Sequence, residues 1–493
     1  MAKIDLVDVS IRDGNQSLWG ATGLNTAKIL EIAPVMDRVG FRALDFNSST
    51  HMAMAVRYDR EDPWERIRLT HAAAPNTPLQ YITTGFRFIA WETANPEFMR
   101  LVYRRIAEAG IGRIIVLDPM HDIDALLAAC KMAKEEGIAD VMAALTYTIS
   151  AVHDDEFYAN VARACAACPS IDRAYIKDPA GILLPDRART LVPAVQAALG
   201  DKPLEIHAHC TVGLGPLAYM VAAEFGITAV HTAAGALANG TSLPSASRIV
   251  ANLREMGHTV DIDDRTLALV ESYFTRLADA EGLPHGRPQE FDAAYLRHQM
   301  PGGAITTLQR QLKEIGQEHR LAAVIEEVPR VRAELGYPIM VTPFPQIVST
   351  QAMLNVTSGT RYGSVPDQVI RYVLGKFGRP TAPVDPDIMD KIMALPRARE
   401  LMNEPPPPSP AELRKRFGPN MSDEELLLRA VMPAEQVDAM LAAGPAKRGY
   451  NPDSRALIEL LKEMAKRPPV SEFSIEKPGM KIRLRSNGAA AHG

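Results

Sequence analysis

The chain has 493 residues, 47% of them hydrophobic, and a formal net charge of −5 at pH 7. This length allows two to four domains of roughly 100–200 residues each. Because the sequence has no basic cluster, we expect neither nucleic acid nor an anionic membrane as the main partner. No apolar run is long enough to span a bilayer. Four cysteines are too few for a disulfide scaffold of this size, which predicts a cytoplasmic protein.

Strand-like and helix-like segments alternate up to about residue 290. Eight apolar runs predict strands over residues 4–9, 42–46, 79–83, 112–117, 141–147, 173–176, 204–208 and 228–231. Amphipathic stretches with helical spacing lie between them, such as 26–39, 96–109, 123–136, 155–168 and 185–199. This pattern predicts a (β/α)₈ TIM barrel in the α/β class. A doubly wound sheet is disfavoured because the Gly-x-Gly-x-x-Gly fingerprint is missing after the first strand.

The sequence His207-Ala208-His209 ends the seventh predicted strand and precedes a glycine-rich turn. Side chains alternate across a strand, so the two imidazoles of an H-x-H pair point to the same side. Two neutral imidazole nitrogens on one side form half of a metal site. A single histidine is more often a core or surface residue than a ligand, so the argument depends on the residues around this pair.

Polar residues also follow or end the first and sixth predicted strands, at Asp13 and Lys177. In a TIM barrel the carboxyl ends of the strands share one mouth, where the chemistry takes place. Asp13, His207 and His209 therefore predict a site for a borderline divalent ion such as zinc, manganese or cobalt. A protonated Lys177 beside a dication is electrostatically costly. Lys177 is thus an outer residue, a neutral amine, or a carbamylated side chain that supplies an oxygen ligand.

Six motifs spread in order over most of the chain give it a specific resemblance to a known family. The motifs are Ile11-Arg12-Asp13-Gly14-Asn15-Gln16-Ser17, Glu61-Asp62-Pro63-Trp64-Glu65-Arg66, Ile176-Lys177-Asp178-Pro179-Ala180-Gly181, His207-Ala208-His209, Gly240-Thr241-Ser242-Leu243-Pro244-Ser245 and Met300-Pro301-Gly302-Gly303. Together they resemble the carboxyltransferase component of biotin-dependent enzymes, which includes pyruvate carboxylase, oxaloacetate decarboxylase alpha chains and transcarboxylase. In that family carboxybiotin supplies the carbon dioxide, which agrees with the lack of a P-loop in the sequence.

The resemblance implies four metal ligands: Asp13, a carbamylated Lys177, His207 and His209. It places Gln16 beside the substrate and implies that Thr306 moves a proton between the acceptor carbon and the biotin nitrogen. Lys177, Gln16 and Thr306 are therefore the expected catalytic residues. It also implies biotin supplied in trans by a biotin carboxyl carrier protein, a separate biotin carboxylase subunit, and a homo-oligomeric assembly.

The chain departs from the family around the substrate. Thr84 stands at the place of an arginine that grips the carboxylate of a keto acid, so the bidentate anchor is lost. Arg87 either replaces that anchor from another angle or is an ordinary surface residue. The family's Trp-Gly-Gly-Ala-Thr-Phe-Asp is residues 47–53 here, a tyrosine is replaced by Trp91, and the acid after the second histidine is Cys210. Both a pyruvate-like and an altered acceptor therefore remain open.

The sequence predicts three parts. Residues 1–290 form the metal-dependent barrel, residues 291–445 form a helical region that covers the barrel mouth in the family, and residues 446–493 form an extension. The extension is expected to contain a helix over 454–466 and strands over 470–475 and 480–484. It resembles the segment that precedes the biotinyl domain in acetyl-CoA carboxylase carrier proteins. We expect it to dock a separate subunit; a flexible tail is the alternative.

Two other functions fit part of the pattern. Lyases and acyltransferases related to 3-hydroxy-3-methylglutaryl-CoA lyase share Arg-Asp-Gly after strand one and His-x-His after strand seven. The motifs 61–66, 176–181 and 300–303 argue against them. The second alternative is a non-catalytic scaffold subunit, although drift would erode a metal constellation first. We therefore predict a carboxyltransferase subunit of a multisubunit biotin-dependent carboxylase.

Overall fold

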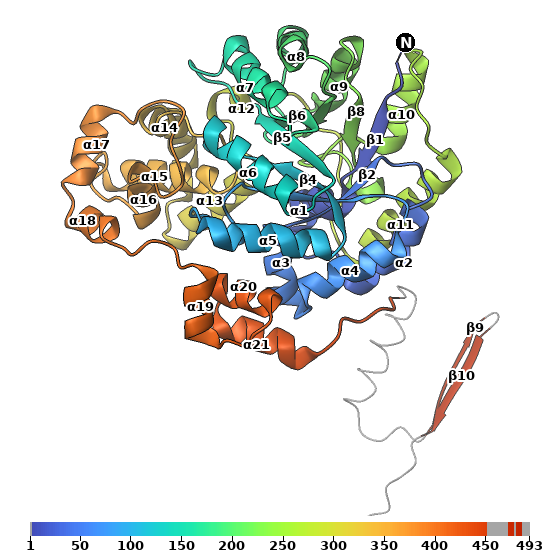
Figure 1. Ribbon diagram of the computed structural model, residues 1–493. Coiled ribbons are helices and arrows are strands. Elements are labelled where there is room, and N and C mark those ends of the chain that lie inside the picture. Colours follow the sequence, from blue (N-terminus) through green and yellow to red (C-terminus); the bar gives the residue numbers. More distant parts are fainter. Residues whose placement is uncertain (1, 451–471, 478–479, 486–493) are drawn as a thin grey trace, which may run out of the picture. The chain divides into compact units, whose positions relative to one another are not determined.

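The computed structural model describes residues 2–450, 472–477 and 480–485 (Figure 1). The side chain of Thr306 and the predicted helix over 454–466 lie outside that description. The chain forms two compact units, Met1–Arg448 and Gly449–Gly493. Within the described residues, no helix combines the length and the apolar character needed to cross a bilayer.

Eight parallel strands close a barrel in the order in which they occur in the chain. The strands are β1 (Asp5–Asp8), β2 (Ala43–Ser48), β3 (Leu79–Thr83), β4 (Ile111–Val116), β5 (Asp140–Thr146), β6 (Arg173–Asp178), β7 (Leu204–Ala208) and β8 (Ala229–Thr232). Strand β1 pairs with β8, with Asp5 opposite Ala229, and this pairing closes the ring. The predicted TIM barrel is confirmed, and the predicted strand ends differ from the observed ones by at most two residues.

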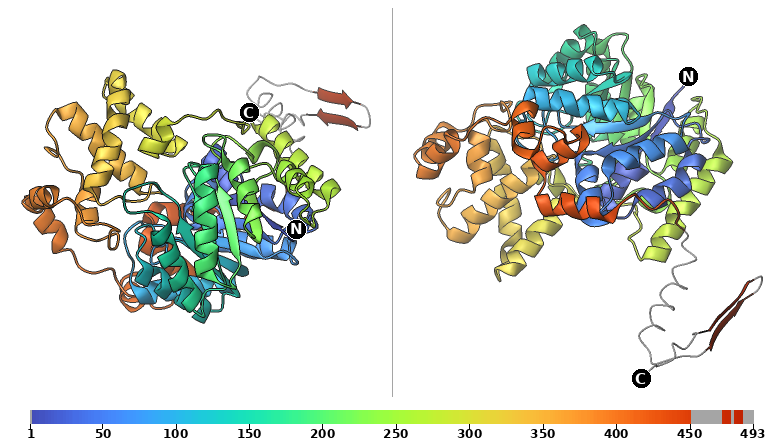
Figure 2. Two further views of the ribbon diagram at one scale, coloured as in Figure 1. Left: turned by 90° about the horizontal axis from the view of Figure 1, so that it is seen from above. Right: turned by 60° about the horizontal axis from the view of Figure 1, so that its bottom comes forward.

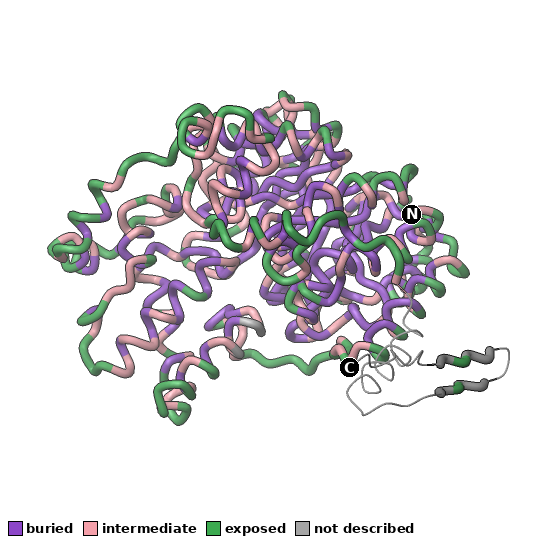
Figure 3. The backbone as a smooth tube through the Cα atoms, turned by 90° about the horizontal axis from the view of Figure 1, so that it is seen from below, coloured by how far each residue is buried: buried purple, intermediate pink, exposed green. Residues whose placement is uncertain are grey.

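Helices surround the strands (Figure 1), and the centre of the barrel is buried (Figure 3), as expected for a parallel barrel whose strands are covered on both faces. They are α2 (Thr26–Met36), α4 (Pro63–Ala73), α5 (Pro96–Glu108), α6 (Ile123–Glu135), α7 (Asp155–Ala167), α8 (Pro185–Leu199), α9 (Gly215–Glu224), α10 (Ala246–Glu255) and α11 (Asp264–Glu281). Shorter helical turns follow three strands: η1 (Ser10–Gly14), α1 (Asn15–Trp19), α3 (Ser49–Met54), η2 (Ala55–Asp59) and η3 (Gly235–Leu237). Helix α5 shows how the sequence sets a helix start. Asn95 accepts a hydrogen bond from the backbone of Glu97, and Pro96 occupies the first helical position, which needs no amide donor.

A helical region follows the barrel; most of it gathers on one side of the barrel (Figure 2), whereas its last helices pack against η2 and α5. Its helices are α12 (Ala294–His298), α13 (Gly302–Glu314), η4 (Glu318–Arg320), α14 (Leu321–Glu334), α15 (Phe344–Ser358), α16 (Asp367–Val373), α17 (Pro386–Met393), α18 (Pro396–Met402), α19 (Pro410–Phe417), α20 (Asp423–Val431) and α21 (Ala434–Ala443). Phe344 lies in its core, with the rings of Tyr372 and Phe377 5.6 and 6.0 Å away in edge-on packing. Burial of such aromatic rings stabilises the region.

Buried polar contacts join the helical region to the loop after β5. Arg332 of α14 donates to the carbonyl oxygen of Ile149 and to the hydroxyl of Thr148, each at 2.7 Å. The same hydroxyl donates to the side-chain oxygen of Gln299 at 2.8 Å. Met120, from the loop after β4, packs into the apolar core of the helical region. These contacts hold the region against the carboxyl ends of the strands.

In the second unit, β9 (Glu472–Lys477) and β10 (Met480–Arg485) form an antiparallel pair, with Ile475 opposite Ile482. Both strands predicted for the extension are therefore present, the first of them shifted toward the C-terminus.

Candidate active site

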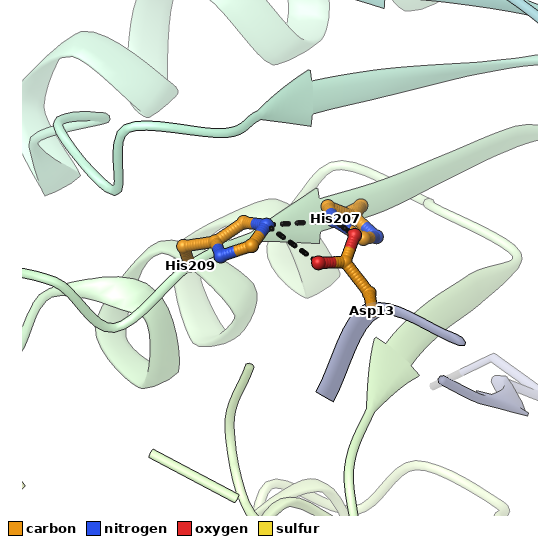
Figure 4. Close-up of side chains that lie close together, drawn as sticks. All are labelled: Asp13, His207 and His209. Atoms are coloured by element: carbon orange, nitrogen blue, oxygen red, sulfur yellow. Dashed lines mark hydrogen bonds and ion pairs between the residues drawn. The ribbon is translucent and has the colours of Figure 1, made fainter. Parts of the chain in front are cut away.

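The four residues predicted as metal ligands lie together at the carboxyl end of the barrel. Asp13 lies in η1, shortly after β1. Lys177 is the penultimate residue of β6 and pairs with His207 on β7, and His209 follows β7. Oxygen and imidazole nitrogen atoms of Asp13, His207 and His209 all lie within 4.8 Å of one another (Figure 4). The ammonium nitrogen of Lys177 is 3.4 Å from Asp13 Oδ2 and 3.2 Å from His207 Nε2.

The backbone fixes the tautomer of His209. Its Nδ1 is 2.7 Å from the carbonyl oxygen of Thr241. A carbonyl oxygen only accepts hydrogen bonds, so Nδ1 carries the proton and Nε2 keeps a free lone pair. This Nε2 lies 3.2 Å from His207 Nε2 and 3.5 Å from Asp13 Oδ1.

A buried relay fixes the tautomer of His207. Burial disfavours the charge on Glu205, but the neighbouring Arg113 and His231 hold the pKa of Glu205 below its ordinary value, so the carboxylate is ionised. It accepts from His231 Nε2 at 3.1 Å. Burial lowers the pKa of His231 and keeps the ring neutral, so His231 Nδ1 is an acceptor. It lies 3.2 Å from His207 Nδ1, which therefore carries the proton and leaves His207 Nε2 unprotonated.

Acceptor atoms of Asp13, His207 and His209 thus face one another, and the Lys177 amine contacts the first two of these residues. His207 Nε2 lies 3.2 Å from both His209 Nε2 and Asp13 Oδ2. Lone pairs at this separation repel, and a shared cation removes the repulsion. Ligand atoms about 2.0–2.2 Å from one zinc-like ion are spaced by about 3 Å. These residues therefore fit a divalent ion that prefers nitrogen and oxygen ligands.

Two further charged residues, which the sequence analysis did not single out, hold Asp13 in place. Arg12 donates to Asp13 Oδ2 at 2.7 Å and to Asp45 Oδ2 through its Nε, also at 2.7 Å. Burial opposes ionisation of Asp13, yet the positive charge of Arg12 holds its pKa well below the ordinary value. Burial also lowers the pKa of Lys177, which favours the neutral amine.

A cavity of about 260 Å³ opens beside these residues. The polar residues that the barrel contributes include Arg12, Asp13, Gln16, Thr84, Lys177 and His209, together with several serine and threonine hydroxyls. The helical region contributes Pro301, Ala304, Met340, Val341, Thr342 and Gln346. Gln16 and Thr84, both predicted to lie at the substrate, line this cavity beside the candidate metal centre. Helix α13 also carries Thr306, whose side chain is outside the described part of the chain.

Arg87 does not reach this cavity. It is 3% exposed, so the alternative that it is an ordinary surface residue is wrong. One terminal nitrogen donates to the carbonyl oxygen of Thr84 at 2.9 Å and lies 3.5 Å from Asp118, while the other donates to the carbonyl oxygen of Phe377. Arg87 therefore joins the barrel to the helical region, and it is not among the described residues that line the cavity.

Sequence reasoning missed Glu205 and His231. A signal was present for Glu205, because it precedes His207 by two residues and thus shares its side of β7. An acid on the inner side of a buried strand needs a partner. Nothing in the sequence indicates that His231, on β8, is the group between Glu205 and His207.

The fold and the site define a (β/α)₈-barrel enzyme with a candidate metal centre at the mouth and a helical cover. Residues 296–464 match the family model described as a conserved carboxylase domain. The chain is 35% identical to a pyruvate carboxylase subunit of Methanocaldococcus jannaschii over 393 residues, which are 79% of this chain and 68% of the relative. It is 30% identical to the 2-oxoglutarate carboxylase large subunit of Hydrogenobacter thermophilus over 99% of this chain and 76% of that subunit.

Among solved structures, the carboxyl transferase domain of Rhizobium etli pyruvate carboxylase with pyruvate and biocytin superposes with a TM-score of 0.80. The match has 25% identity and covers 90% of this chain and 78% of that one. The chain therefore belongs to the family of carboxyltransferase components of biotin-dependent carboxylases. These relatives agree with the predicted carboxyltransferase and with neither alternative, the lyase or the scaffold.

Proposed function

We propose that this chain is the carboxyltransferase subunit of a multisubunit biotin-dependent carboxylase, acting on an enolisable carbonyl compound. The observation that carries the proposal is the set of three unprotonated acceptor atoms on Asp13, His207 and His209, at the covered mouth of the barrel. In the transfer, the nitrogen–carbon bond of carboxybiotin breaks and a carbon–carbon bond forms at the α-carbon of the acceptor. The α-proton passes to the ureido nitrogen, so atoms and charge balance.

Asp13, His207, His209 and a carbamylated Lys177 are the proposed ligands of a zinc, manganese or cobalt ion. Such an ion, when bound, polarises the acceptor carbonyl and stabilises the negative charge that develops on its oxygen. The lowered pKa of Lys177 supports carbamylation, because the neutral amine is the form that adds carbon dioxide. A carbamate also replaces a cation with an anionic oxygen donor, which removes the electrostatic cost of an ammonium group beside a dication.

The remaining roles belong to Gln16 and Thr306. Gln16 lines the cavity beside Asp13, and we assign its amide to orientation of the acceptor. Thr306 is assigned to proton transfer between the acceptor carbon and the biotin nitrogen, by resemblance to the family. Support for that position comes from Pro301 and Ala304, which bring the first turns of α13 to the cavity.

The proposed partners are a biotin carboxyl carrier protein and a biotin carboxylase subunit, with biotin supplied in trans. The relative from Methanocaldococcus jannaschii is named as one subunit of a pyruvate carboxylase, which supports a divided enzyme. We assign residues 1–290 to the catalytic barrel, 291–445 to its helical cover and 446–493 to a docking extension. The β9–β10 pair supports the last assignment, since an isolated two-stranded sheet is marginally stable in water. A homo-oligomer and a cytoplasmic location complete the proposal.

The test measures metal content and biotin-stimulated decarboxylation in the purified full chain. Oxaloacetate and methylmalonyl thioester are both offered, so that either class of acceptor reveals activity in the reverse direction. The Lys177→Ala variant is expected to lose bound metal and turnover together. Lys202→Ala is the matched control, because Lys202 contacts only the carbonyl oxygens of Cys165 and Cys168 among the hydrogen bonds identified for it. Full metal content in the Lys177 variant contradicts the proposal.

A further inference from the structure

Among the described residues that line the cavity beside the candidate metal centre, no side-chain cation is available for a substrate carboxylate. The arginine and lysine side chains among these described lining residues are Arg12 and Lys177. Arg12 is held by Asp13 and Asp45, and Lys177 lies 3.4 Å from Asp13. Thr84 presents a hydroxyl where the family has an arginine. A neutral hydroxyl donates one hydrogen bond, whereas a guanidinium donates two to a carboxylate.

A second cavity of about 360 Å³ adjoins the first. The two share Trp91, Thr342 and Gln346 as lining residues. The rest of the outer cavity is formed largely by apolar side chains of the helical region, including Ile347 and Val369. None of the described residues that line it is charged. An apolar space of this kind favours a hydrocarbon group.

The loop between β3 and α5 connects these two observations. It carries Thr84, where the anchor for an anion is lost, and Trp91, which lines both cavities. Thr84 and Trp91 thus belong to one loop, and Trp91 borders both the inner and the outer cavity.

Resting on the proposed function, we propose that the acceptor is an uncharged carbonyl compound with an apolar chain, of the acyl thioester class. Its carbonyl group lies in the inner cavity at the candidate metal centre, and its chain extends past Trp91 into the outer cavity. Each methylene group buried there raises kcat/KM about three- to fourfold. A 2-oxo acid without an alkyl chain gains nothing from this space, and the carboxylate next to its oxo group has no side-chain cation as a partner among the described lining residues.

The test uses the metal-loaded full chain with free biotin and two series of matched chain length. One series is alkylmalonyl thioesters of N-acetylcysteamine, with alkyl groups from methyl to hexyl, and the other is oxaloacetate with the same 3-alkyl groups. The expected result is a rise in kcat/KM with chain length for the thioesters, to values at least tenfold above those of the keto acids. Faster turnover of oxaloacetate overturns the acceptor class and leaves the proposed function intact. If neither series turns over in the presence of metal and biotin, the proposed function fails as well.

Three variants test where the apolar chain of the substrate binds. Thr350→Trp fills the outer cavity from α15, and we expect it to lower kcat/KM at least tenfold for the hexyl substrate but not for the methyl one. Thr357→Trp is the control on the same helix, because Thr357 is not among the residues that line this cavity. Thr84→Arg is expected to shift preference toward oxaloacetate. If Thr350→Trp instead raises KM for biotin equally with every substrate, the outer cavity holds the biotin arm and the proposal is overturned.

Discussion

His231 Nδ1 lies 3.2 Å from His207 Nδ1, and both rings are fully buried. Since Glu205 fixes the proton of His231 on Nε2, at the far side of that ring, His231 Nδ1 accepts a hydrogen bond from His207 Nδ1. A candidate metal ligand on β7 is thus oriented by a residue on β8 that cannot itself reach the metal centre. Groups of this kind tune both the geometry and the basicity of metal-ligating histidines.

Replacing His231 is therefore expected to weaken metal binding. In His231→Phe the ring still stacks on Tyr175, whose centroid is 5.3 Å away, but the acceptor for His207 is gone. We expect metal affinity to fall about 10–100-fold, measured by competition with a chelating dye. His231→Gln offers a carbonyl oxygen at the same place and is expected to retain more affinity. Equal affinity in the wild type and both variants contradicts the relay.

Carbamylation of Lys177 predicts that metal binding depends on carbon dioxide. Protein stripped of metal in degassed buffer is expected to rebind the ion weakly until bicarbonate is added. In Lys177→Ala, acetate supplies a carboxylate in place of the carbamate, so it is expected to restore part of the metal content. Metal analysis after gel filtration measures both effects. If metal rebinding does not depend on bicarbonate, then either the amine of Lys177 itself contacts the metal or no atom of Lys177 does.

Thr306 offers a separate test of proton transfer. Thr306→Val keeps the branched shape and removes the hydroxyl, so we expect carboxyl transfer to fall at least a hundredfold, in line with general acid–base contributions of about 10²–10⁴. Metal content is expected to stay at the wild-type level. Thr306→Ser retains the hydroxyl and serves as the control. A fully active valine variant removes Thr306 from the mechanism.

Asp8 predicts a pH dependence of stability. Burial raises the pKa of Asp8 from 3.8 to about 7 in the folded protein. Between these values the unfolded chain loses its proton before the folded one, so the contribution of Asp8 to stability is present at about pH 4 and is lost as the pH rises to about 7. Asp8→Asn does not titrate. Its free energy of unfolding is expected to equal that of the wild type near pH 4 and to exceed it by on the order of 4 kcal/mol above pH 8, measured with urea. If the difference in free energy of unfolding between Asp8→Asn and the wild type does not change with pH, the raised pKa assigned to Asp8 is contradicted.

The barrel was predictable because each strand and each helix is indicated by residues that lie close together in the sequence. Apolar runs such as residues 204–208 have strand length, helices such as α5 carry their own cap, and alternation alone puts His207 and His209 on one side. Asp13 and Lys177 followed from the rule that the carboxyl ends of barrel strands share one mouth. These inferences need only neighbours in the chain.

Contacts between distant segments were not predictable in this way. Arg87 is buried because it donates to the carbonyl oxygen of Phe377 in the helical region, which no local pattern indicates. The pairing of Arg12 with Asp45 depends on the register of β1 against β2. The outer cavity depends on how Trp91 faces α15 and the start of α16. Each case is decided by tertiary packing and not by a sequence period.

The pairing of β1 with β8 also determines the order in which the protein can form. Strand β1 is synthesised before the other strands of the barrel, but one of its two edges stays unpaired until β8, the last of them, has been synthesised. Unpaired strand edges bind other chains readily, and long-range pairing slows folding. We therefore expect newly made chains to depend on chaperones until Ala229–Thr232 has been synthesised, and truncations before β8 to aggregate.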